Sequence, residues 1–127
     1  MQEKYLFEYA VIRVVPRVER EEFINVGVIL YCAKQKFLQA LYHLDADKMH
    51  CLSPASDIDE LHQHLCMFEN ICTGSPQGGP IAALDPASRF RWLTATRSTV
   101  MQCSKVHPGL TANPLETLER LHAQLVL

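Results

Sequence analysis

The sequence predicts an α+β fold: a mainly antiparallel sheet of about five strands with two helices packed against it, in the order β-β-β-α-β-β-α. Three apolar, strand-like runs follow one another through short polar connections, and two amphipathic segments with helical spacing come later in the chain. A chain of 127 residues is long enough to bury a core without disulfides or metal ions. We therefore expect residues 1–127 to form a single domain.

The first three strands are predicted at residues 5–15, 24–32 and 37–44. The middle run is almost entirely β-branched, aliphatic or aromatic, so we place it centrally in the sheet. The three-residue connection at 34–36 is too short for a parallel crossover, which predicts an antiparallel meander. Gly27 interrupts the middle strand, and a glycine there usually marks a bulge or a close backbone approach.

An acidic, amphipathic helix is predicted at residues 58–72. Asp57 with Glu60 forms a capping-box pattern at its start. Its apolar stripe recurs at helical spacing and comprises Ile58, Leu61, Leu65, Phe68 and Cys72. Residues 73–80, Thr-Gly-Ser-Pro-Gln-Gly-Gly-Pro, then predict a long flexible loop within the domain.

Two further short strands are predicted at residues 90–95 and 99–104, with Arg97 and Ser98 at the bend between them. We expect His107-Pro108-Gly109 to end the second strand. A final helix is predicted after Asn113, which is a favourable N-cap, because Pro114 suits the first helical position. An apolar stripe on this helix covers the sheet; it comprises Leu115, Leu118, Leu121, Leu125 and Val126.

The composition argues against several classes of function. With 14 acidic and 12 basic residues, the chain has no general attraction for nucleic acid, and we do not expect it to bind one. No signal sequence and no membrane-spanning run is visible, so we expect a cytoplasmic protein without membrane association. The five cysteines lack a C-x-x-C pair, which favours reduced, buried thiols. We expect no metal site and no cofactor.

The main candidate site is the segment Arg89-Phe-Arg-Trp-Leu-Thr-Ala-Thr-Arg-Ser-Thr99. From residue 86 to 115 the chain contains four bases and no acid. Arginine side chains, hydroxyls and a turn amide beside an aromatic ring can hold a phosphate. Alternatively, the first two arginines face solvent or pair with the acidic helix, while the tryptophan belongs to the core. The candidate binding residues, for a protein partner or an anion, are Arg89, Arg91, Trp92, Arg97, Ser98 and His107.

Glu22 and Asn25, with Glu21, form a secondary candidate surface that could face a cation or a basic partner, but a solvated charged turn is the preferred interpretation. Ser98 or Cys103 with His107 suggests nucleophilic catalysis, but no G-x-S-x-G elbow or cysteine-enzyme signature surrounds them. We therefore assign no catalytic residue and expect a binding protein rather than an enzyme.

Several ordered strings carry a family resemblance: Tyr9-Ala-Val-Ile-Arg-Val-Val-Pro16, Glu21–Tyr31, Arg89–Ser98, and His107-x-Gly-Leu110 with Pro114. On these strings the chain resembles, nearly end to end, the bacterial family catalogued as domain of unknown function 3037. One departure is Thr96, where the family pattern has proline, which leaves the bend before Arg97 less rigid.

The resemblance implies a gene neighbourhood rather than a reaction. Such proteins are often encoded beside a kinase-like protein similar to the HipA toxins, which implies a small accessory or regulatory subunit with a possible toxin–antitoxin association. Carried over by position, the shared functional surface comprises Glu22, Asn25, Arg89, Trp92, Arg97, Ser98 and His107.

Two hypotheses follow. The first is a protein-binding accessory or regulatory subunit, with a HipA-like kinase as a candidate partner, docking through the arginine–tryptophan segment or an exposed sheet edge. The alternative is a phosphate- or nucleotide-binding protein or enzyme, in which Arg97 and Ser98 hold the phosphate and Glu22 or His107 acts as acid or base. The sequence leaves the oligomeric state open.

Overall fold

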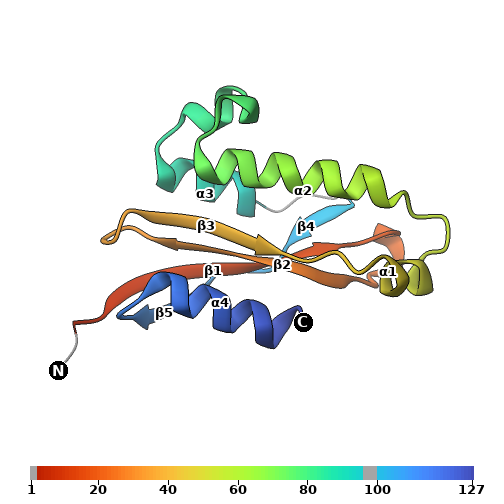
Figure 1. Ribbon diagram of the computed structural model, residues 1–127, viewed down its shortest axis with the longest axis horizontal. Coiled ribbons are helices and arrows are strands. Elements are labelled where there is room, and N and C mark those ends of the chain that lie inside the picture. Colours follow the sequence, from red (N-terminus) through yellow and green to blue (C-terminus); the bar gives the residue numbers. More distant parts are fainter. Residues whose placement is uncertain (1–2, 96–99) are drawn as a thin grey trace.

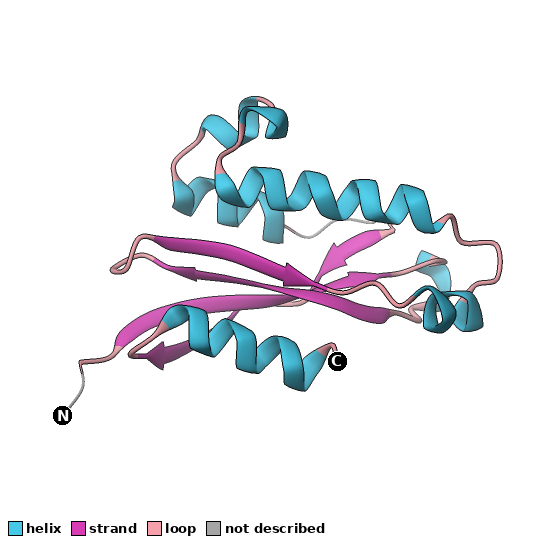
Figure 2. Cartoon of the chain, in the orientation of Figure 1, coloured by secondary structure: helices cyan, strands magenta, loops and turns pink. Residues whose placement is uncertain are grey.

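The structure is a computed structural model that describes residues 3–95 and 100–127. A five-stranded sheet lies between two helical layers, with α2 and α3 on one face and α4 on the other (Figures 1 and 2). The strands are β1 (Tyr5–Val14), β2 (Ile24–Cys32), β3 (Phe37–Tyr42), β4 (Met101–Cys103) and β5 (His107–Thr111). The α-helices are α1 (Ala46–Leu52), α2 (Ile58–Thr73), α3 (Pro86–Thr94) and α4 (Pro114–Leu125), and short 3-10 helices span Val18–Arg20, Pro76–Gly78 and Pro80–Ala83.

All strand pairs are antiparallel. The sheet order is β3-β2-β1-β4, and β5 also pairs with β1. β4 and β5 divide the second edge of β1 between them, since β4 pairs with Ile12–Val14 and β5 with Tyr5–Tyr9. The predicted α+β class, the antiparallel five-stranded sheet and the three-strand meander are confirmed.

Gly27 lies at a β-bulge, as predicted. Ile12 pairs with Gly27, but its neighbour Arg13 pairs with Asn25, so Val26 has no partner on β1. A Cβ atom on Gly27 would lie 2.6 Å from the carbonyl oxygen of Leu41, which explains why the position is glycine. The bulge turns Val26 toward the core beneath α2, while Asn25 reaches the end of α4 on the opposite face.

Each face of the sheet has its own core. Ala10, Ile12 and Val14 of β1 point toward α2 and α3, where they pack with fully buried Leu65 and Phe90. The alternate side of the sheet packs against α4 through Phe7, Val28, Leu30, Cys32 and Leu118. Strand alternation therefore divides the apolar residues between two layers.

The prediction of a strand at residues 90–95 is wrong, because this segment belongs to helix α3. The side chain of Asp85 accepts a hydrogen bond from the backbone N–H of Ser88, and Pro86 occupies the first turn. Phe90 and Leu93 are buried three residues apart, on one face of the helix. Over residues 3–95 and 100–127 the observed order is β-β-β-α-α-α-β-β-α, with four α-helices where two were predicted.

Two other elements were not predicted. Helix α1 begins where Asp45 caps the N–H of Lys48, and it buries Met49. Strand β5 occupies residues that were expected to end a strand. Pro108 is tolerated there because β5 lies at an edge of the sheet, and Gly109 lies directly beneath the ring of Phe7.

The helices predicted from residues 58 and 114 are confirmed, with Asp57 and Asn113 as their N-caps. The predicted loop at 73–80 contains one complete 3-10 helix and the first residue of another. None of the five cysteines, all of which the structure describes, forms a disulfide, but Cys51 and Cys66 are exposed, so the expectation of burial is wrong for these two. Among the described residues, no helix is long and apolar enough to cross a membrane.

Candidate functional site

Arg89 joins the end of α2 to α3. Its Nη1 donates to the carbonyl oxygens of Ile71 and Cys72, at 3.0 and 2.8 Å. These carbonyls lie in the last turn of α2, where backbone acceptors lack intrahelical donors and carry the negative end of the helix dipole. The left-handed C-cap Gly74 leaves room for the guanidinium, because a Cβ there would lie 3.0 Å from Nη1. Arg89 therefore stabilises the end of a helix.

Arg91 ties α3 to the sheet. Its Nη1 and Nη2 donate to the two carboxylate oxygens of Glu8 on β1, at 2.9 and 2.7 Å, and its guanidinium lies 5.3 Å from the centre of the Phe90 ring. Donation of these hydrogen bonds to the Glu8 carboxylate raises the pKa of Arg91. Both arginines thus have acceptors within the protein, as in the alternative in which they pair with the acidic helix. The acceptors of Arg89 are on that helix, α2, whereas the acceptor of Arg91 is on β1.

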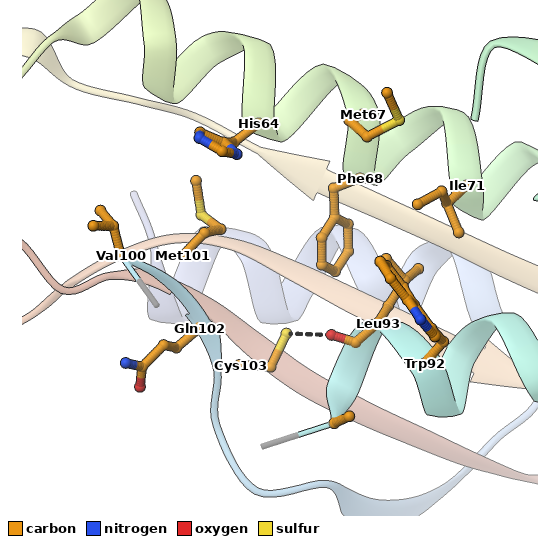
Figure 3. A pocket seen from close by; sticks show the side chains of 11 residues that line it. His64, Met67, Phe68, Ile71, Trp92, Leu93, Val100, Met101, Gln102 and Cys103 are labelled. Atoms are coloured by element: carbon orange, nitrogen blue, oxygen red, sulfur yellow. Dashed lines mark hydrogen bonds between the residues drawn. The ribbon is translucent and has the colours of Figure 1, made fainter. Parts of the chain in front are cut away.

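Trp92 lines a cavity of about 340 Å³ between α2, α3 and β4 (Figure 3). We call this cavity the Trp92 groove. Its lining residues are His64, Met67, Phe68, Ile71, Trp92, Leu93, Ala95, Val100, Met101, Gln102 and Cys103.

The Trp92 groove has a buried apolar floor and exposed apolar walls. Phe68 and Leu93 are buried, whereas Met67, Val100 and Trp92 are 46%, 44% and 38% exposed. Figure 3 shows the side chains of Phe68, Leu93 and Trp92 gathered at one end of the groove. Large apolar side chains that stay exposed around a buried floor are typical of an interaction surface.

His107 lies on the other face of the sheet. It is the cross-strand partner of Tyr9, and the two rings lie 5.2 Å apart. Tyr9 packs with the core beneath α4, whereas its neighbour Glu8 binds Arg91 on the α3 side. Successive residues of a strand point to opposite faces, so His107 does not converge with the α3 side chains.

The secondary candidates lie apart from each other. Glu22 forms an ion pair with Arg20 and lines a cavity of about 320 Å³. Asn25 donates from Nδ2 to the carbonyl oxygen of Leu125 at 3.1 Å and lines a different cavity of about 240 Å³. Arg97 and Ser98 lie outside the described residues. The structure therefore brings together Arg89, Arg91 and Trp92 on α3, but places Glu22, Asn25 and His107 elsewhere.

Sequence reasoning missed the α2 wall of the Trp92 groove. The predicted apolar stripe of α2 includes Phe68 but not Met67, which precedes it and lies three residues after His64 and four before Ile71. An apolar residue beside the buried stripe of an amphipathic helix was the available signal. Val100 gave no comparable signal, since only the fold places it beside α2.

Burial and hydrogen bonding shift the pKa values of two side chains, one on α2 and one at the start of α3. Burial raises the pKa of the Cys72 thiol to about 12, which keeps it protonated and unreactive at neutral pH. Hydrogen bonds from the side chain and backbone of Ser88 lower the pKa of Asp85, the N-cap of α3. Within residues 3–95 and 100–127, no three His, Cys, Asp or Glu side chains are grouped closely enough to hold a metal ion.

Comparison with known sequences identifies one family. The model of the family described as "Protein of unknown function (DUF3037)" matches residues 9–126. No curated protein matches the chain, and no solved structure does. Because the match covers nearly the whole sequence, the chain belongs to the DUF3037 family.

Proposed function

We propose that this protein is a protein-binding accessory or regulatory subunit that docks its partner through the Trp92 groove. The observation that carries the proposal is the grouping of Met67, Trp92 and Val100. These three large apolar side chains come from α2, α3 and the residue before β4, and all remain more than a third exposed. Covering them removes apolar surface from water, which favours association.

Trp92 is the expected energetic centre of the interface. Tryptophan is enriched among the interface residues whose truncation costs most binding energy, especially where a rim of other side chains excludes water. Here Met67 and Val100 provide part of such a rim, and Phe68 and Leu93 form a preformed floor. A preformed surface loses less conformational entropy on binding than a mobile one.

A HipA-like kinase is the proposed partner. Support for this choice comes from the gene neighbourhood that the family resemblance implies, and the groove supports only the more general statement that a protein binds there. The proposal keeps the cytoplasmic location expected from the sequence. It makes the chain a subunit that binds the kinase and changes its activity.

The test is co-expression of the tagged chain with the product of its neighbouring kinase-like gene. The wild type should retain the kinase at fixed stoichiometry and change its activity, whereas Met67→Glu and Trp92→Ala should reduce retention at least tenfold. Leu115→Glu is the matched control, since Leu115 is 42% exposed on α4, against 46% for Met67 on α2. Equal retention by Met67→Glu and Leu115→Glu would exclude the groove as the docking surface.

The alternative function, phosphate or nucleotide binding, rests on Arg97 and Ser98, because Arg89 and Arg91 already bind acceptors within the protein. A thermal-shift series with inorganic phosphate and ATP tests it. A rise in melting temperature that saturates with ligand, and that Arg97→Gln abolishes, would favour this alternative.

A further inference from the structure

The Trp92 groove adjoins a second cavity of about 370 Å³, with which it shares His64 and Val100. The second cavity shares Pro16, Arg17, Ser53 and Ala55 with a third, of about 320 Å³. The three cavities therefore follow one another in series, and together we call them the α2 trough.

One face of α2 forms a wall along most of the trough. Its lining residues Asp57, Glu60, His64, Met67 and Ile71 recur every three or four positions. From the N-cap Asp57 to Ile71 this wall rises through 14 residue steps, or about 21 Å at 1.5 Å per residue. An extended chain rises about 3.3 Å per residue, so about six residues of a strand-like segment match this length.

The trough changes from apolar to charged along its length. The end at Trp92 is apolar, whereas the opposite end carries Arg17, Arg20 and Glu22. Arg20 pairs with Glu22. Within the part of the chain that the structure describes, the exposed side chain of Arg17 has neither an ion pair nor a hydrogen bond. Arg17 is therefore available to bind a carboxylate from outside the protein.

The α2 side of the trough carries two carboxylates. The side chain of Asp57 accepts the N–H of Glu60 at the start of α2. The carboxylate of Glu60 lies 3.8 Å from His64, one turn further along, and pairs with it as an ion only when His64 is protonated. These contacts do not remove the negative charge of either side chain, so the unpaired positive charge of the trough is that of Arg17, at the end where Arg20 pairs with Glu22.

We infer that the α2 trough binds an extended segment of about six residues from the partner protein, with a large apolar side chain at the Trp92 end and an acidic side chain beside Arg17. This inference rests on the proposed function and specifies the chemistry of the partner. Each cavity, at 320–370 Å³, has room for one or two side chains. A helix would need about 14 residues to span the same distance of about 21 Å, because it rises only about 1.5 Å per residue.

Photo-crosslinking of the full chain, co-expressed with the HipA-like neighbour, tests the inference. We would place p-benzoylphenylalanine at Met67 near one end of the trough, at Ala55 near the other, and at Leu115 on α4 as a control. The expected result is that Met67 and Ala55 both crosslink to one stretch of the kinase no longer than about eight residues, and that Leu115 does not crosslink.

The charged end has a separate test. Arg17→Glu should weaken kinase binding about three- to tenfold, and replacing the acidic residue of the crosslinked stretch by lysine should restore it. Arg120→Glu, on the exposed side of α4, is the matched control. Binding of Arg17→Glu at the wild-type level would overturn the charge assignment.

The failures of the two proposals are distinguishable. Crosslinking from Met67 but not from Ala55, or from the two positions to distant parts of the kinase, would overturn the extended-segment inference and leave the docking groove standing. No co-purification together with no crosslink from any position would overturn both.

Discussion

Replacing Arg89 by methionine tests whether the arginines of α3 hold the fold together. Methionine keeps most of the aliphatic length of arginine but removes the guanidinium. The change deletes both hydrogen bonds from Nη1 to the carbonyl oxygens of Ile71 and Cys72, and it removes a positive charge from the C-terminal end of α2. The Ile71 carbonyl keeps the backbone N–H of Gly74 as a donor, at 3.2 Å.

The expected loss of unfolding free energy follows from these two hydrogen bonds. A hydrogen bond to a charged group contributes about 1.5–3 kcal/mol, but water can reach part of this half-buried site. The Nε atom of Arg89 is buried without a partner, so losing it offsets part of the cost. We expect a net loss of about 2 kcal/mol of unfolding free energy. With an unfolding entropy of about 2.1 cal/mol/K per residue over 127 residues, the melting temperature should fall by about 7 °C.

Urea unfolding followed by circular dichroism, together with a thermal melt, measures this loss. Arg120→Met on the exposed face of α4 should stay within about 0.5 kcal/mol of the wild type. If the Arg89→Met variant kept the stability of the wild type but lost binding to phosphate or ATP, the structural role would be refuted and the anion-site interpretation restored.

Three further predictions concern the sheet, the α3 contact and pH. Gly27→Ala should lower the unfolding free energy by about 1–3 kcal/mol, since its Cβ would lie 2.6 Å from the Leu41 carbonyl oxygen; urea unfolding unchanged from the wild type would contradict the close approach. A double-mutant cycle between Glu8 and Arg91 should give a coupling of about 0.5–1 kcal/mol, because Arg91 is largely exposed; zero coupling would mean that this ion pair does not stabilise the α3 contact. Burial lowers the pKa of His122 from 6.5, so the folded state binds a proton less readily than the unfolded chain, and stability should fall as the pH drops below about 6.5. Melting temperatures from pH 8 to 5 should fall less in His122→Gln, and parallel curves would exclude His122 as a contributor.

The meander and helices α2 and α4 could be predicted because their sequence signals are local. The meander follows from three apolar runs with short connections, and the bulge at Gly27 follows from a glycine in a buried strand. Helices α2 and α4 each combine an N-cap with a long amphipathic pattern, and both signals agree.

Helix α3 was missed although it carries the same start signal as α4. Asp85 followed by Pro86 repeats the pattern of Asn113 followed by Pro114, an N-cap and then a proline in the first turn. The aromatic and threonine-rich segment that follows favours a strand by composition, and tertiary packing of Phe90 overrides that preference.

The candidate site could be predicted only in part. Trp92 was selected because it lies in a segment rich in arginine and hydroxyl residues, and it lines the groove. The acceptors of Arg89 and Arg91 are 18 and 83 residues away along the chain, so no local pattern indicates them. The face on which His107 lies could not be predicted, because strand β5, which carries it, was not recognised in the sequence.

Amide hydrogen exchange on the complex tests the central claim most directly. The tagged chain would be measured alone and with the co-purified HipA-like kinase. The proposed function predicts that the kinase slows exchange in α2 and β4, which line the Trp92 groove, and leaves exchange on the outer face of α4 unchanged. Slowed exchange confined to α4, or no change in α2 and β4 despite a stable complex, would contradict docking at the groove.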